Sequence, residues 1–126
     1  MFPLLLLAFS VLFGIISILI ALPLLDEKIK PNLIYGFRVR ATLENPKIWY
    51  AVNKYFAQRL FLAALVEIVI AVVLFATNID PLTYVLSTLG VFVIAFTIGM
   101  MQTSSYLKSI ARESNNSVGK PDLRIK

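Results

Sequence analysis

The chain contains neither cysteine nor histidine. These absences exclude disulfides, thiol chemistry, zinc sites built from Cys and His ligands, and acid–base catalysis by imidazole. Charge is also scarce, because only 15% of the 126 residues are charged and 59% are hydrophobic, against about 25% and roughly 45–50% in ordinary globular proteins. A domain of this length is too small to bury so much apolar surface within itself. The composition therefore favours lipid over water as the surrounding solvent.

Three long apolar runs account for the missing charge. Phe2–Leu25 has 24 residues without a charge and Leu82–Met101 has 20, whereas Leu60–Ala76 has 17 residues interrupted only by Glu67. A helix of about 20 residues crosses the hydrocarbon core of a bilayer. The run Leu60–Ala76 reaches this length if its helix begins near Phe56 and Arg59 extends to the interface. The sequence predicts an all-α, multi-pass protein of the cell membrane.

The expected organisation is a single transmembrane domain, residues 1–113, followed by a polar cytoplasmic tail. The predicted spans are about 2–25, 57–77 and 82–106, the connecting segment is 26–56, and the tail is 114–126. The third helix should extend two or three turns past Tyr106, whereas the Ser- and Asn-rich residues from Ser114 indicate a flexible tail unless a partner orders it. A cleaved signal peptide is the alternative for the first run, but no basic residue precedes it and the run is too long. We therefore expect a retained helix.

The basic residues indicate the orientation. Seven lie between Asp26 and Arg59 and the other five follow the third run, so all twelve fall on one side of a three-span arrangement. Because Lys and Arg accumulate in cytoplasmic loops, this side is expected to be cytoplasmic and the N-terminus to be outside. Attraction to anionic headgroups then explains the net charge of +5 without a nucleic-acid partner.

Each predicted span carries a row of small or weakly polar residues at helical spacing. Such rows favour close packing of helices in lipid, and thus a three-helix bundle. The rows are Ser10, Gly14, Ser17 and Ala21; then Ala63, Glu67 and Ala71; then Thr83, Ser87, Ala95 and Gly99.

Glu67 is an intramembrane polar residue near the middle of its span. A charged group at this depth is costly, so its side chain is expected to face the bundle interior or water. One interpretation is a neutral carboxyl that locks the helices together by donating to Ser10, Ser17 or a backbone carbonyl. A proton relay or a ligand-sensing role is the alternative.

The connecting segment contains "PNLIYGFRVRATLENPKIWYAVNKY", residues 31–55, with the only Trp of the chain. Asn45 and Pro46 are typical of a helix start, and "PNLIYG" indicates a turn in which Gly36 permits a positive φ. The following residues predict an interfacial amphipathic helix between the first and second spans, and the alternative is that this helix leads directly into the second span. Its apolar side would carry Ile48, Trp49, Val52 and Phe56, with Lys47, Asn53 and Lys54 turned away.

The order of polar residues in this stretch resembles the signature of the SdpI family of small integral membrane proteins. The matching positions are Asn32, Tyr35, Gly36, Phe37, Arg38, Thr42, Leu43, Asn45, Trp49 and Asn53. Two positions depart from the family pattern: Val39 replaces a Thr and Ala57 replaces a Gly. The family carries this motif between two membrane spans, in agreement with its place here.

The resemblance implies an immunity-like protein that binds a toxin, a lipid or a protein partner in the membrane. The alternative is an accessory or structural subunit of a larger membrane complex. Arg38 and the aromatic helix provide groups that bind an anionic headgroup or a protein. Because the sequence offers no metal-ligand cluster, nucleophile–base pair or phosphate-binding Gly loop, we expect neither a catalytic site, a metal nor a cofactor.

Overall fold

The structure is a computed structural model, and it describes residues 1–119. Its elements are α1 (Phe2–Leu25), α2 (Arg40–Glu44), α3 (Pro46–Ala76) and α4 (Pro81–Val118). Three of them, α1, α3 and α4, are long and apolar enough to cross a membrane. Within the described range there is no β-strand. The predicted all-helical membrane protein with three spanning helices is therefore confirmed.

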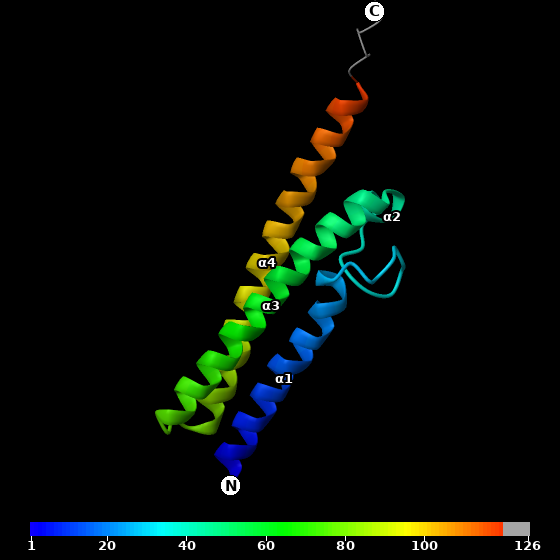
Figure 1. Ribbon diagram of the computed structural model, residues 1–126. Helices are drawn as coiled ribbons and strands as arrows, with labels where there is room; N and C mark the ends of the chain where they lie inside the picture. Colours follow the sequence, from blue (N-terminus) through cyan, green and yellow to red (C-terminus); the bar gives the residue numbers. More distant parts are fainter. Residues whose placement is uncertain (120–126) are drawn as a thin grey trace, which may run out of the picture.

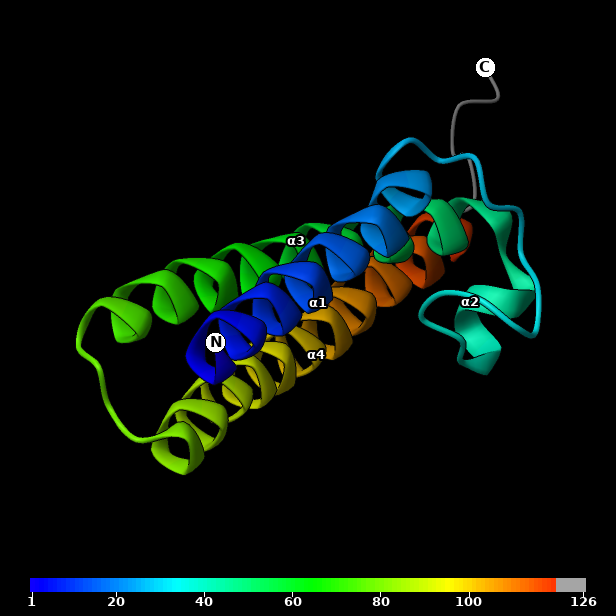
Figure 2. The ribbon, with the colours of Figure 1, turned by 90° about the horizontal axis from the view of Figure 1, so that it is seen from below.

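The three long helices run side by side as an elongated bundle (Figures 1 and 2). Each begins with Pro in its first turn. Proline suits this position because the N–H that it lacks would have no partner within the helix. Asn45 caps α3 by accepting from the N–H groups of Lys47 and Ile48, and Asp80 caps α4 by accepting from the N–H of Thr83 at 3.0 Å. Both of these starts follow from side-chain chemistry that the sequence displays.

The helices differ in length, and the excess lies at one end of the bundle. α3 has 31 residues and α4 has 38, which is about 46 Å and 57 Å of helix at 1.5 Å per residue. Both exceed the roughly 30 Å of a hydrocarbon core. The parts of α3 and α4 beyond this length lie at the end of the bundle opposite to the N-terminus, together with α2 and the loop before it (Figure 1). Residues 26–45 form a folded structure over this end, and we name this segment the cap.

α3 is the central helix of the bundle. It packs along both α1 and α4, whereas α1 and α4 touch each other only locally. The contacts use small residues, since Gly14, Ser17 and Ala21 of α1 and Ala63 and Ala71 of α3 are all buried. The predicted small-residue faces of these two helices are therefore confirmed, except that Ser10 is only partly buried.

The predicted face of α4 was partly wrong. Thr83 is exposed, and the buried residues of α4 are Tyr84, Thr88, Gly99 and Thr103. The face is rotated by one residue at its start because Tyr84 packs against α3, where its hydroxyl donates to the carbonyl of Ala71 at 3.3 Å. A large aromatic side chain with a polar tip thus takes the place that the small-residue row assigned to Thr83.

Residues 46–56 form no separate interfacial helix in the structure. They are the first turns of α3, which continues without a break into the second span. The expected interfacial amphipathic helix between the first two spans is therefore not observed as a separate element, and the structure agrees with the alternative, a helix that leads directly into the second span. The only helix lying apart between α1 and α3 is α2, with five residues. α4 continues to Val118, past the predicted start of the tail at Ser114, and residues 120–126 of that tail lie outside the described range.

Candidate functional site

The cap brings the family motif together around one amide. Asn53 is 2% exposed, and its Oδ1 accepts from the N–H of Phe37 at 2.5 Å. Its Nδ2 donates to the carbonyl of Trp49 at 3.0 Å and to that of Phe37 at 3.4 Å. Asn53 was predicted to be turned away from the apolar side of its helix, and this was wrong. The amide is buried because the cap folds over it and supplies the backbone partners that a buried amide requires.

Gly36 makes the close approach of the cap to Asn53 feasible. Its φ is 104°, a conformation that L side chains rarely adopt. A Cβ added at this position would also meet Oδ1 of Asn53. The predicted positive φ at Gly36 is confirmed, and the structure adds the reason: the glycine directly faces the central amide.

Replacing Gly36 by alanine should destabilise the fold by about 1–3 kcal/mol, because it combines an unfavourable φ with a clash. Equilibrium unfolding of the purified protein in mixed micelles measures this change. The matched control is Gly90→Ala, since a Cβ at Gly90 meets nothing within 4 Å and alanine is the better residue in a helix interior. Equal stability of the two variants would contradict the assigned role of Gly36.

The loop before α2 is fixed by Asn32 and Tyr35. Oδ1 of Asn32 accepts from the N–H groups of Ile34 and Tyr35, each at 2.8 Å, and its Nδ2 donates to the carbonyl of Lys30 at 2.8 Å. The Tyr35 hydroxyl donates to the carbonyl of Ile20 in α1. Burial raises the pKa of this phenol above its ordinary value, so Tyr35 keeps the proton that the bond needs. Together the two side chains tie the turn to the end of α1.

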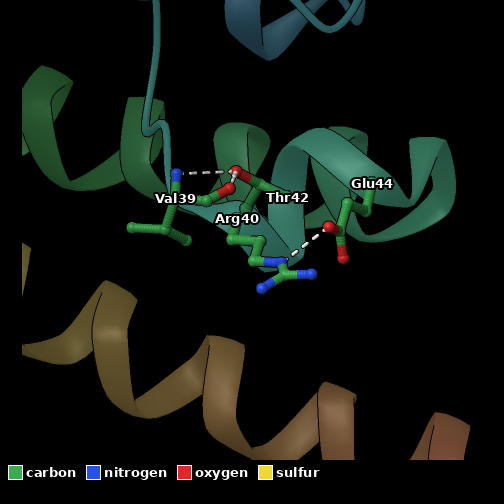
Figure 3. Close-up of polar contacts among 4 residues, drawn as sticks. All are labelled: Val39, Arg40, Thr42 and Glu44. Carbon is green, nitrogen blue, oxygen red and sulfur yellow. Dashed lines mark hydrogen bonds and ion pairs between the residues drawn. The ribbon is translucent and has the colours of Figure 1, made fainter.

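Thr42 organises the short helix α2. Its side chain is fully buried, and its Oγ1 accepts from the N–H of Val39 at 3.0 Å and faces the carbonyls of Val39 and Phe37 at 2.8 and 3.1 Å. Figure 3 shows this contact and, beside it, the exposed pair between Arg40 and Glu44 at 2.7 Å. Val39 is the N-cap residue of α2 and offers no side-chain acceptor. The departure at Val39 therefore removes a capping hydroxyl from α2, and Thr42 reaches back to bind the same residue instead.

Trp49 is part of the protein core. It is 0% exposed, as is the neighbouring Val52, and its Nε1–H donates to the carbonyl of Ile29 at 2.8 Å. The only indole of the chain thus links α3 to the loop that leaves α1. Ala57 also has no exposed surface and packs with Ala21 and Leu24, so the departure from Gly at this position is accommodated by close packing.

Several motif-region side chains remain on the surface of the cap, and three of them, Leu33, Ile34 and Arg38, belong to the loop before α2. Arg38 is exposed, and one of its Nη atoms donates to the carbonyl of Leu33. Leu33 and Ile34, which no sequence pattern singled out, are 75% and 87% exposed at the tip of the loop. We name these three residues the cap face. An exposed cation beside two exposed aliphatic side chains matches a lipid headgroup region or a protein surface.

Charged residues fix the cap to α3 at its edge. Lys54 and Glu27 form an ion pair at 3.0 Å, and both are about half exposed. An ion pair of this kind contributes little to stability. Deeper along α3, the Arg59 guanidinium lies 4.6 Å from the ring centre of Tyr55 and donates to its hydroxyl at 2.9 Å. Tyr55 stacks on Tyr106 of α4 at 4.5 Å, an aromatic contact that the sequence did not predict.

Glu67 lies inside the bundle, as predicted, and is 3% exposed. Its buried Oε2 has no hydrogen-bond partner among the described residues, and the hydroxyl of Ser17 donates to the carbonyl of Phe13. The interhelical hydrogen bonds expected for Glu67 in one of the two interpretations are therefore not formed among the described residues. In the described range, no cluster of acidic residues has the arrangement of a metal site.

The fold and the cap define a small multi-pass membrane protein in which a polar motif closes one end of a three-helix bundle. The chain belongs to the SdpI/YfhL protein family, whose sequence model matches residues 28–102. The matched segment begins in the cap and includes α2, α3 and the first 22 residues of α4, Pro81 to Gln102. Comparison with curated proteins and with solved structures finds no match.

Proposed function

We propose that this protein is an immunity-type membrane protein that acts by binding through its cap and not by catalysis. Family membership supports the immunity type. The observation that carries the binding role is the cap face: Leu33, Ile34 and Arg38 are exposed on a loop whose backbone is fixed by Asn32 and Asn53. A rigid loop with exposed apolar tips binds at a low entropic cost.

We further propose that the cap lies at the cytoplasmic surface, with the N-terminus outside. In support, the described basic residues lie in the cap, in the first turns of α3 and in the last turns of α4, and these parts lie at one end of the bundle (Figure 1). α2 and the first turns of α3 would then lie among anionic headgroups. There the cap face meets its partner: the headgroups themselves, a toxin that has entered the bilayer, or a membrane protein.

The test is protection of a sensitive bacterial strain against a membrane-active peptide toxin. Arg38→Ala should reduce protection about tenfold or more, because a charge-assisted hydrogen bond contributes about 1.5–3 kcal/mol and 1.4 kcal/mol corresponds to a factor of ten. The matched control is Arg40→Ala, since Arg40 is also exposed but pairs with Glu44 within α2. Full protection by Arg38→Ala, at equal membrane abundance, would refute the role of the cap face.

A role as an accessory subunit is supported by a different observation. α4 remains helical to Val118, well past the bundle, and this projecting part offers a surface to another chain. Purification in mild detergent separates the two functions. A stoichiometric larger partner that is lost when residues 108–126 are deleted would favour the accessory subunit, whereas a lone monomer would count against it.

A further inference from the structure

We propose that the groove between α1 and α4 is a docking site for a transmembrane helix that carries a hydrogen-bond donor near its middle. The groove lies within the membrane-spanning part, away from the cap, so this inference does not depend on the proposed function. α1 and α4 each pack along α3 and touch each other only locally. The residues that line the groove come from α1 and α4, with Glu67 of α3 at its floor. The resulting cavity has a volume of about 260 Å³, and its lining includes Phe9, Ser10, Phe13, Glu67, Thr88 and Leu89.

Glu67 gives the groove its chemical specificity. It is the only charged residue within Leu60–Ala76, and the apolar runs of α1 and α4 contain none. Its buried Oε2 has no partner among the residues 1–119, and Gly14 lets α1 approach so closely that a Cβ there would lie 3.0 Å from this oxygen. A buried polar group without a partner is costly in lipid, and a donor from outside the chain would remove this cost.

The depth of Glu67 identifies the kind of molecule that supplies the donor. Glu67 is eight residues from Arg59 and ten from Thr77 at the hairpin, which is about 12 and 15 Å along the helix. It therefore lies near the middle of the bilayer, where lipids present only hydrocarbon. A membrane-spanning polypeptide is the partner that places an amide or hydroxyl at this depth, because its backbone is satisfied within its own helix.

The walls of the groove suit a helix. Phe9 is 77% exposed and Leu89 is 52% exposed, and they offer apolar contacts on either side of the Glu67 carboxyl. Ser10 and Thr88 lie on opposite walls, and their small side chains leave room between them. At one end the groove is closed by Phe13 and Phe92, whose ring centres are 4.8 Å apart in an edge-on contact. Hydrophobic grooves are a recurring way in which proteins bind a helix, and the carboxyl at the floor adds a polar contact.

The experiment measures energy transfer between the labelled full-length protein and synthetic peptides in phosphatidylcholine vesicles. The probe is a leucine-rich transmembrane peptide with one central asparagine, and the control peptide has leucine at that position. The asparagine peptide should bind the wild-type protein about three- to tenfold more tightly than the leucine peptide, as expected for one interhelical hydrogen bond. Equal binding of the two peptides would overturn the proposal.

Variants of the protein test whether binding uses the groove. Glu67→Leu should remove the preference for asparagine, whereas Glu67→Gln, which keeps an acceptor, should retain it. Ser10→Phe should fill the groove and weaken binding of the asparagine peptide, and the matched control Val69→Phe, on an exposed part of α3, should leave it unchanged. An unchanged preference in Glu67→Leu, or transfer between two labelled copies of the protein that depends on Glu67, would refute a foreign helix as the occupant.

Discussion

Replacing Trp49 by alanine is expected to destabilise the protein by about 3–5 kcal/mol, the usual cost of removing a fully buried indole from a core. The side chain has no exposed surface, and its Nε1–H donates to the carbonyl of Ile29. The substitution therefore leaves a cavity between α3 and the loop and also an unpaired carbonyl. Equilibrium unfolding in mixed micelles measures the loss.

Trp49→Phe separates the two contributions. Phenylalanine retains most of the apolar volume but cannot donate to Ile29, so its cost should be nearer to that of one hydrogen bond, about 1 kcal/mol, plus a smaller cavity. If Trp49 served only as a lipid anchor at the interface, alanine would cost little stability. A loss below 1 kcal/mol for Trp49→Ala would therefore contradict the buried position.

Replacing Asn53 by leucine should cost about 3 kcal/mol. Leucine has a similar volume, but it leaves the buried N–H of Phe37 without its acceptor and presents a methyl group where the cap backbone approaches. A buried donor left unpaired costs about 1–3 kcal/mol, and the steric conflict adds to it. Unfolding in the same micelles gives the value. Hydrogen exchange at Phe37 should increase at the same time, because the cap opens locally.

Two further variants test whether the loss of stability in Asn53→Leu comes from the buried amide. Asn116→Leu, at an exposed position near the end of α4, should change stability by less than about 0.5 kcal/mol. Asn53→Asp keeps the acceptor for Phe37 but places a second carboxylate oxygen against the carbonyls of Phe37 and Trp49, so it should also destabilise the protein clearly more than Asn116→Leu. A stable Asn53→Leu protein with an intact cap would show that the amide is not central to the motif.

Much of the bundle could be predicted from the sequence because lipid imposes strict demands on a chain. An uncharged run of 20 or more residues must form a helix to satisfy its backbone, so α1 and α4 were expected close to their observed starts. The helix starts at Asn45 and Pro46 follow from capping chemistry. These features depend on local sequence alone, which is why they required no knowledge of the tertiary structure.

The cap could not be predicted in the same way. Helical periodicity places Asn53 on the polar side of α3, and only the folding of residues 36 and 37 over it makes that side an interior. Trp49 was expected at the membrane interface because the local sequence does not show its hydrogen-bond partner. That partner, the carbonyl of Ile29, lies 20 residues away. The start of the α4 face was displaced by Tyr84, whose size outweighs the small-residue pattern. Each error arose where a contact with another part of the fold, and not the helical periodicity, decided the environment of a side chain.

The spacing of the cap contacts has a consequence for biogenesis. Three hydrogen bonds of the cap connect Tyr35 with Ile20, Phe37 with Asn53, and Trp49 with Ile29, which are 15, 16 and 20 residues apart, and the exposed pair of Lys54 and Glu27 spans 27 residues. Pairings over such short separations form quickly, because little chain must be ordered to close them. During synthesis, α1, the cap and α3 can thus assemble as a helical hairpin while α4 is still being translated. The last helix then enters the membrane beside a preformed template.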